Sequence, residues 1–115
     1  MPLRLAIGFD GVLHDPNNVL EGYKLGQPIE GAVGAVQKLK NEGAIIVIHS
    51  VWANTEQRKL AMSKWLRFFS IPYDFISHEK PDVDFYIDDK AIHHTTWQNT
   101  LQEITRRVAY LKRNS

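Results

Sequence analysis

The chain has 115 residues and a mass of 13.2 kDa, the size of one domain, so we expect a single domain spanning residues 1–115. A composition of 43% hydrophobic and 23% charged residues with a net charge of +1 excludes a wholly disordered chain and gives no electrostatic reason to expect a nucleic acid or an anionic membrane as partner. The chain lacks cysteine, which excludes a disulfide scaffold and a thiol nucleophile, and it lacks a membrane-length apolar run and a leader-like N-terminus, so we expect a cytoplasmic protein with no membrane contact.

Apolar runs and turn residues alternate along the chain. Short β-branched runs predict buried strands, and apolar residues at helical spacing predict helices. Glycines and prolines mark the boundaries between these elements. In chain order we expect a strand at residues 3–9, a long loop or flap at 10–30, a helix at 31–42, a strand at 44–49, a helix that begins at Asn54 and ends before Pro72, strands at 74–77 and 84–88, and a terminal helix.

Three details of the helices can also be predicted. Asn54 followed by Gln57 resembles a capping box, so we expect Asn54 to cap the second helix. Trp65 and Trp97 are expected in the core. The terminal helix carries an apolar seam that is more typical of packing on the sheet than of a coiled-coil dimer, because it is only about two heptads long. The seam consists of Trp97, Leu101, Ile104, Val108 and Leu111.

The alternation of strands and helices predicts an α/β fold with a mostly parallel sheet. Right-handed crossovers would place helices on both faces of that sheet, which gives a Rossmann-like three-layer α/β/α sandwich. In such sheets ligands bind outside the carboxyl ends of the strands. The polar residues at those ends are Asp10 after the first strand, Ser50 after the second, and Asp88 and Asp89 after the last.

The residues at these strand ends carry the groups of a phosphate site. Clustered carboxylates repel each other unless a cation intervenes, and oxygen ligands suit Mg²⁺, which keeps several waters and binds substrate phosphate. The hydroxyl of Ser50 and the ammonium of Lys80 are groups that hold phosphate oxygens. Each residue alone is more often a turn, a cap or a solvated side chain, but their joint placement indicates a phosphate site with a hard cation.

Four motifs in this order resemble those of the haloacid dehalogenase (HAD-like) superfamily of phosphohydrolases. The first motif of that family, Asp-x-Asp-Gly after an apolar strand, corresponds to Gly8-Phe9-Asp10-Gly11. The second, a serine or threonine after an apolar strand, corresponds to Ser50, and the third, a lysine, to Lys80. The fourth, an acidic pair after an apolar strand, corresponds to Asp88-Asp89. Order and spacing agree along nearly the whole chain.

The resemblance implies a role for each matched residue. Asp10 takes the place of the general acid/base and of a Mg²⁺ contact. Asp88 takes the place of a direct Mg²⁺ ligand, and Asp89 that of a water-mediated one. Ser50 and Lys80 take the catalytic places that hold phosphate and balance charge. Further substrate contacts are expected from Gly11, from His14 in the flap, and from Trp52, which would stack on a base or sugar or else pack beneath its loop.

Gly8 departs from the family, because the nucleophilic aspartate stands at this position in the family and glycine has no side chain. We therefore expect a Mg²⁺-dependent phosphohydrolase (phosphatase) scaffold that is inactive or impaired. The alternative is a non-catalytic pseudoenzyme that binds a phosphorylated ligand or partner. A further alternative is that Gly8 is an isolated change in an otherwise working enzyme.

Residues 14–30 and 70–79 are too short for the cap domain that many members of the family insert, so the resemblance implies a capless type with an open site. An open site suits polynucleotide ends, protein phosphates or, if Trp52 stacks on a base, a nucleotide. The sequence does not predict the oligomeric state.

Overall fold

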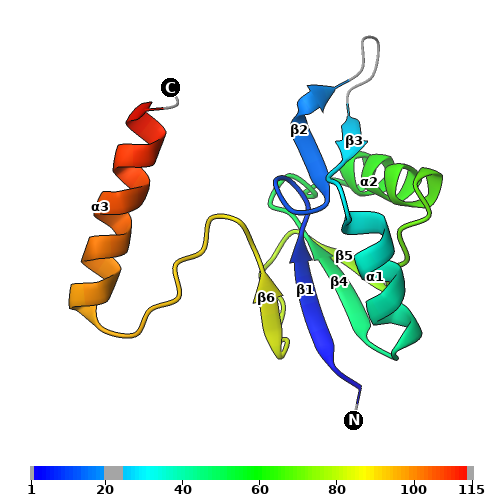
Figure 1. Cartoon of the computed structure of the whole chain (residues 1–115). Helices are drawn as coiled ribbons and strands as arrows, with labels where there is room; N and C mark the ends of the chain where they lie inside the picture. The colour runs from blue at the N-terminus through cyan, green and yellow to red at the C-terminus, as the bar shows by residue number, and fades with distance from the viewer. Residues whose placement is uncertain (1, 20–24, 114–115) are drawn as a thin grey trace.

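The computed structural model describes residues 2–19 and 25–113 and shows a small α/β protein with a mostly parallel sheet (Figure 1). The elements in chain order are β1 (Arg4–Gly8), β2 (His14–Val19), β3 (Gly26–Pro28), α1 (Ala32–Asn41), β4 (Ile45–His49), α2 (Glu56–Phe68), β5 (Phe75–Ser77), β6 (Phe85–Ile87) and α3 (Trp97–Arg113). Strands β2 and β3 form an antiparallel hairpin apart from the main sheet.

Strand β1 lies inside the four-stranded main sheet, whose order is β5-β4-β1-β6. It pairs in parallel with β4, with Gly8 opposite His49, and in parallel with β6, with Ile7 opposite Ile87. Strand β4 pairs in parallel with β5. Because all four strands run in one direction, their carboxyl ends meet at one edge of the sheet, the edge from which the β2–β3 hairpin rises (Figure 1).

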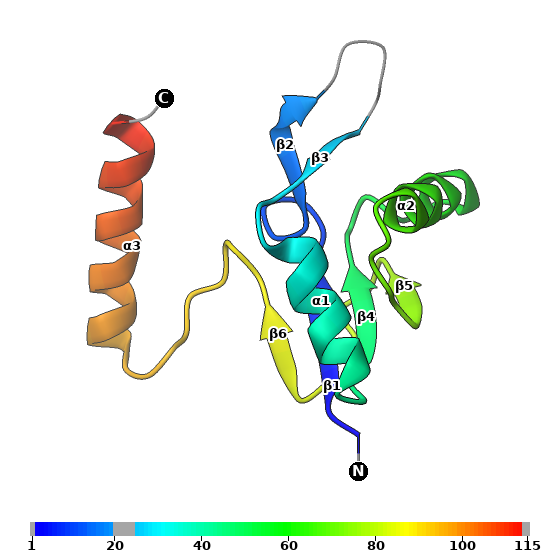
Figure 2. The same ribbon diagram turned by 45° about the vertical axis from the view of Figure 1, so that its right-hand side comes forward.

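One face of this sheet forms the core with helices α1 and α2. Ile7 of β1 and Ile48 of β4 are partners in the register, so their side chains point to the same face. Both belong to a single buried cluster that also contains Val36 of α1 and Leu66 of α2. Burial of each such side chain contributes about 1.5–3 kcal/mol. The two helices therefore cover the same face of the sheet (Figure 2).

The opposite face is crossed by the connection between β5 and β6, residues 78–84. There the hydroxyl of Tyr86 donates a hydrogen bond to the carbonyl of Pro81, and the ammonium of Lys80 lies 4.4 Å from the centre of the Tyr86 ring. The described part of the chain places no helix on this face (Figures 1 and 2). The third layer expected from the sequence therefore stays a prediction.

Helix α3 forms where the apolar seam predicts it, but the seam does not pack on the sheet. The helix stands apart, at the end of an extended connection over residues 88–96 (Figures 1 and 2). Trp97 is 69% exposed and the other seam residues are exposed too, so the expected packing of the seam and the expected burial of Trp97 are wrong. Trp65, in contrast, is buried as predicted. Among the described residues, no helix has the length and apolar character needed to cross a membrane.

Two local predictions also need correction. The segment expected to be a loop or flap contains the β2–β3 hairpin, although residues 20–24 of that segment lie outside the described residues. Helix α2 is capped by Thr55 and not by Asn54, because Thr55 Oγ1 accepts a hydrogen bond from the Arg58 backbone N–H at 3.1 Å. Asn54 Oδ1 instead accepts one from the Arg58 guanidinium at 3.0 Å. The remaining elements form where predicted, with ends shifted by a few residues.

Asp74, just before β5, ties the start of β4 to α1. Its carboxylate accepts a hydrogen bond from the Ile46 N–H at 2.8 Å and pairs with the Lys40 ammonium at 2.7 Å. Partial burial alone would raise the pKa of Asp74, but the Ile46 hydrogen bond and the Lys40 ion pair outweigh that effect and hold the pKa below its ordinary value of 3.8. Asp74 thus stabilises the fold in its charged form.

We predict that Asp74→Asn lowers the free energy of unfolding by about 1–2 kcal/mol at neutral pH, because the ion pair is lost and one acceptor is replaced by an amide. The folded-state pKa lies below the unfolded-state one, so this contribution is present above the unfolded pKa and disappears as the pH falls through the folded pKa, below 3.8. Urea unfolding of the unchanged chain and of Asp74→Asn, from neutral pH to below pH 3.8, measures this contribution to the free energy of unfolding. Glu42→Gln, at an exposed carboxyl on α1's C-terminal cap, serves as control; an equal loss there would contradict the prediction.

Candidate functional site

The carboxyl ends of β1, β4 and β5 are held in one row. Gly8 pairs with His49, and His49 pairs with Ser77 in the registers of the sheet. Just beyond, the Phe9 N–H donates to the His49 carbonyl at 3.2 Å, and the Ser50 N–H donates to the Ser77 carbonyl at 3.0 Å. The turns that follow these strands therefore start side by side, which brings Ser50 to the edge where the first motif ends.

The first and fourth motifs also meet at this edge. Since Ile7 pairs with Ile87, residue 8 lies beside residue 88, and a Cβ built on Gly8 would be 3.9 Å from the Asp88 Cα. Gly11 has a φ of +80°, and a Cβ there would overlap the Asp89 carboxylate. Only glycine fits at residue 11, for its backbone conformation and for this close approach. The turn of the first motif and the acidic pair of the fourth therefore lie side by side at the carboxyl ends of the strands.

His14, at the start of β2, holds the Asp10 carboxylate. The imidazole is 4% exposed, stacks on the Phe9 ring with 5.0 Å between ring centres, and meets the Trp65 ring edge-on. The Gly26 N–H donates to its Nε2 at 2.8 Å, so Nε2 carries no proton. Its Nδ1–H therefore donates to Asp10 Oδ1, at 2.7 Å. The Asp10 side chain is itself 57% exposed, so its second oxygen can face a ligand.

His14 is thus a positioning residue for Asp10, a role that the sequence did not predict. The signal in the sequence is slight: a histidine four residues after the motif aspartate, in a segment of turn residues. Both of its ring nitrogens are engaged, and the ring is buried. Its direct contact with a substrate stays a prediction.

Ser50 and Trp52 lie on the turn between β4 and α2. The Trp52 N–H donates to Ser50 Oγ at 3.2 Å, which leaves the hydroxyl proton available for another acceptor. The Trp52 indole is 37% exposed, and the Arg58 guanidinium lies 5.3 Å from the centre of its ring. The aromatic face that was expected to stack on a base is therefore partly occupied by a cation in this structure.

Lys80 is placed differently from the other motif residues. Its ammonium lies against the Tyr86 ring, on the face of the sheet crossed by residues 78–84. For Lys80 to contact a phosphate at the carboxyl edge, its side chain would have to leave this ring. The structure therefore brings together the residues of the first, second and fourth motifs. The ammonium of Lys80, the third motif, contacts the Tyr86 ring instead.

Two carboxylates of the expected metal site, those of Asp10 and Asp88, accept hydrogen bonds from other groups of the chain. Asp10 accepts from His14, and Asp88 Oδ1 accepts from the Lys90 N–H at 2.8 Å. Within residues 2–19 and 25–113, no group of three or more His, Asp or Glu side chains is arranged to hold a metal ion. Mg²⁺ commonly uses one or two carboxylates plus waters and phosphate oxygens, so the donor chemistry of Asp10, Asp88 and Asp89 still suits it.

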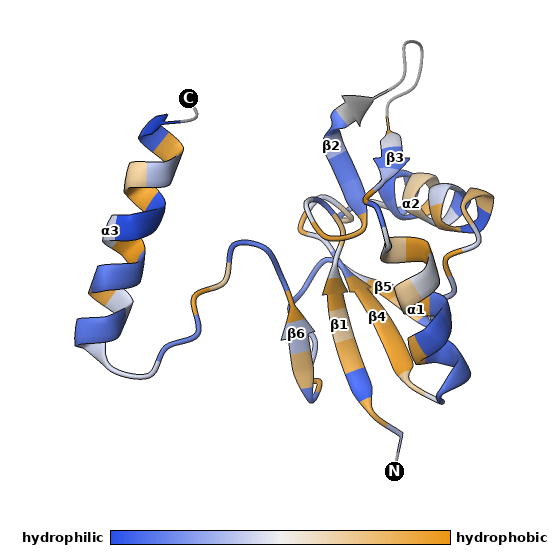
Figure 3. Cartoon of the chain, viewed as in Figure 1, coloured by the Kyte–Doolittle hydropathy of each residue, from blue (hydrophilic) through white to orange (hydrophobic). Residues whose placement is uncertain are grey.

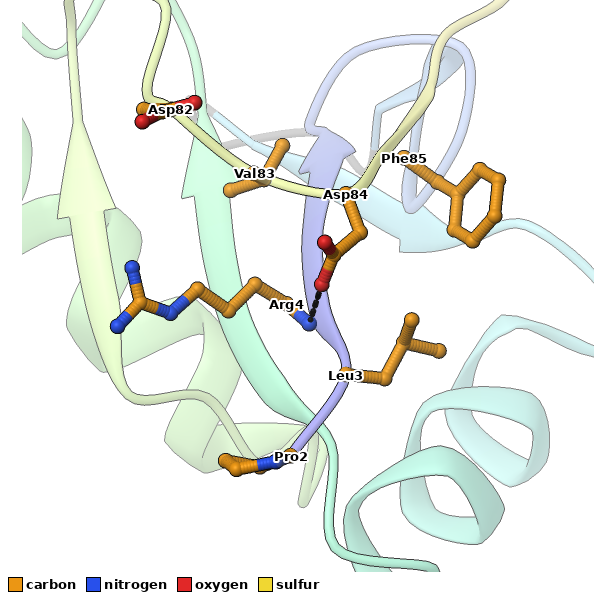
Figure 4. Close-up of a pocket in the computed structure, with 7 residues that line it drawn as sticks. All are labelled: Pro2, Leu3, Arg4, Asp82, Val83, Asp84 and Phe85. Carbon is orange, nitrogen blue, oxygen red and sulfur yellow. Dashed lines mark hydrogen bonds between the residues drawn. The ribbon is translucent and has the colours of Figure 1, made fainter.

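A hollow of about 600 Å³ lies at the opposite end of the strands (Figure 4). It is bounded by the start of β1 and by the residues that lead into β6. Leu3 and Phe85 point to one side of it, and the Arg4 side chain extends to the other (Figure 4). The hollow is therefore separate from the motif residues, and the chemistry of the two places is distinct.

The chain matches no protein-family model and no curated protein. A solved structure described as the conserved protein coded by a locus of Bacteroides thetaiotaomicron is similar to it, with a TM-score of 0.62 over 93% of each chain. The two sequences are 18% identical. At that identity the likeness supports the α/β fold and carries no information on activity.

We predict that His14 exists as the Nδ1–H tautomer, because the Gly26 N–H occupies its Nε2 lone pair. Long-range ¹H–¹⁵N correlation spectra of the imidazole should then show a protonated Nδ1 and an unprotonated Nε2 at neutral pH. Gly26→Pro, which removes the donor, should allow both tautomers. A protonated Nε2 in the unmodified protein would contradict the assigned hydrogen bonds.

Proposed function

We propose that this protein is a Mg²⁺-dependent phosphohydrolase scaffold of the haloacid dehalogenase kind, with turnover impaired by Gly8. The observation that carries the proposal is the meeting of the Gly8–Gly11 turn with Asp88 and Asp89 at the carboxyl edge of a parallel sheet. The four sequence motifs, the absence of room for a cap within residues 14–30 and 70–79, and the α/β fold all agree with it.

In this proposal a phosphorylated ligand binds at the edge, and each motif residue has one task. The hydroxyl of Ser50 donates to a phosphate oxygen, and Asp10, oriented by His14, acts on the leaving oxygen or on water. Asp88 and Asp89 supply oxygen ligands for Mg²⁺, which when bound neutralises charge on the phosphate. Lys80 joins the site once its ammonium leaves the Tyr86 ring.

Gly8 is what limits turnover. The first carboxylate of the family's motif would be the nucleophile, and without it Asp10 has to direct water at phosphorus. A side chain at residue 8 is physically possible, because its φ is ordinary and a Cβ would lie 3.3 Å from the Ile87 carbonyl oxygen and the Val12 methyl. These contacts need a shift of a few tenths of an ångström and no change of backbone region.

We predict that Gly8→Asp gains Mg²⁺-dependent hydrolysis of p-nitrophenyl phosphate, at a rate at least about 100-fold above that of the unchanged chain, because it restores the carboxylate nucleophile. Gly8→Asn is the matched control, since it introduces the same Cβ and nearly the same volume without the charge. It should stay at the rate of the unchanged chain.

Two outcomes would contradict this interpretation of the edge. Equal activity of the unchanged chain and Gly8→Asp would mean that residue 8 is not the nucleophile position. No activity in any variant, together with no binding of Mg²⁺ or inorganic phosphate, would overturn the phosphohydrolase scaffold itself.

A non-catalytic protein that binds a phosphorylated ligand through the same edge is the second candidate, and Gly8 favours it. Its ligand would be a polynucleotide end, a protein phosphate or a nucleotide. A nucleotide requires that the Trp52 ring leave Arg58 and stack on the base. This candidate is distinguished by ligand affinity without turnover in the unchanged chain.

We predict that inorganic phosphate with Mg²⁺ binds the unchanged chain and that Asp88→Asn weakens this binding at least about tenfold, because it removes a charged oxygen ligand. Asp82→Asn makes the same change at the opposite end of β6 and should leave the affinity unchanged. Isothermal titration calorimetry measures both. Equal weakening by the two variants would count against a site at the carboxyl edge.

A further inference from the structure

Helix α3 presents an apolar seam that its own sheet does not cover. Ile104 and Val108, in the middle of the seam, are 40% and 42% exposed, and the stripe is visible between polar residues along the helix (Figure 3). Polar pairs support the helix locally, because Glu103 accepts hydrogen bonds from the Arg106 and Arg107 guanidinium groups, which lower the pKa of Glu103 to about 2. A stable amphipathic helix with an exposed seam calls for a second surface.

A matching surface lies over β6, and we call it the β6 patch: Leu3, Phe85 and Ile87. Phe85 pairs with Leu5 and Ile87 with Ile7 in the register, so these two side chains lie on the face that α1 and α2 cover elsewhere. Neither helix reaches them, and Phe85 is 61% exposed. Leu3 points to the same side as Phe85 (Figure 4). The patch is the uncovered end of an otherwise buried face.

Contacts within the chain hold α3 beside its own connection. Arg107 Nη1 donates to the Lys90 carbonyl at 3.1 Å, which fixes the middle of the helix to the start of the connection. At the other end, His94 Nδ1 is hydrogen-bonded to Thr100 Oγ1 at 2.7 Å. Helix and connection together stand clear of the sheet, and so of the β6 patch, in both ribbon views (Figures 1 and 2).

The charges around the two apolar surfaces are complementary. Aspartates flank β6 on both sides, with Asp82 and Asp84 before it and Asp88 and Asp89 after it. Helix α3 carries four basic residues and one acidic residue, Glu103. When a positively charged helix approaches a strand that is flanked by aspartates, electrostatic attraction raises the association rate and helps to fix how the helix lies along the strand. This effect adds to the burial of apolar surface.

We infer that the partner of both surfaces is a second copy of this chain, with α3 of each copy lying over the β6 patch of the other. A second copy is the one molecule certain to carry both surfaces in complementary form. A two-fold arrangement covers two seams and two patches at once and leaves none open for further growth. The dimer requires no rearrangement of α1, α2 or the β2–β3 hairpin.

Analytical ultracentrifugation across the micromolar range tests this inference. The unchanged chain should sediment with the mass of two 13.2 kDa chains. Ile104→Asp on α3 and Phe85→Asp in the β6 patch should each shift it to the mass of one chain. Leu60→Asp, an equal change at an exposed residue of α2 outside both surfaces, should remain a dimer. A single-chain mass for the unchanged protein would overturn the inference, and so would dissociation by Leu60→Asp.

Because the chain has no cysteine, disulfide cross-linking can show whether a dimer forms through α3 and the β6 patch or through other surfaces. Double variants that combine Phe85→Cys or Ile87→Cys with Ile104→Cys or Val108→Cys are oxidised and run on a non-reducing gel. Disulfides between two chains are expected. Disulfides within one chain would show that α3 folds over its own sheet, and a dimer in which no combination forms a disulfide would place the interface elsewhere; either result overturns the inference.

Discussion

The parallel pairing of β1 with β4 on one side and β6 on the other places the ends of the motif-bearing strands together. It sets residue 8 beside His49 and beside Asp88. Three strands that are far apart in the sequence therefore end next to one another. A shift of the β6 register by one residue would exchange Ile87 for Asp88 on the core side. The buried Ile7–Ile48 layer holds the centre of this pairing, and the hydrophobic core thus determines where the polar edge lies.

Above that edge the chain is organised by one buried imidazole. His14 stacks on Phe9, which directly follows β1, and meets Trp65 of α2 edge-on; both of its ring nitrogens are hydrogen-bonded, one with the hairpin strand β3 and one with Asp10. The β2–β3 hairpin is consequently coupled to the position of the Asp10 carboxylate. The Trp65 indole N–H donates to the Gly26 carbonyl at 2.8 Å, so α2 is part of the same network.

The elements that the sequence predicted are those whose signal is local. The β4 strand is β-branched up to its last residue, His49, and burial of such a run depends little on what surrounds it. The β2–β3 hairpin was missed because HDPNNV has no apolar alternation, and because His14, which joins it to the core, contacts Trp65 far along the sequence. For α3 the seam predicted which face is apolar, whereas nothing local in the sequence predicted that the helix stands away from the sheet at the end of residues 88–96.

The motif residues at the edge were predictable for a related reason: strand ends in a parallel sheet converge whatever the side chains are. The contacts that these side chains make were not predictable, because each side chain can interact with several neighbouring groups. Lys80 has the Tyr86 ring within reach, and Asp88 has the Lys90 N–H two residues away. The sequence could place Asp88 at the carboxyl edge, but it could not determine that Asp88 accepts from Lys90 or that Lys80 lies against Tyr86.

Two of the three carboxylates at this edge have hydrogen-bond donors within the chain. Asp10 accepts from the Nδ1–H of His14 and Asp88 from the backbone N–H of Lys90, whereas the Asp89 carboxylate lies against Gly11. Gly8 removes what would be a further negative charge from the same place, which lowers the repulsion among those that stay. In the function proposed above, glycine at residue 8 therefore impairs bond making at phosphorus and leaves the groups proposed to hold a phosphate in place.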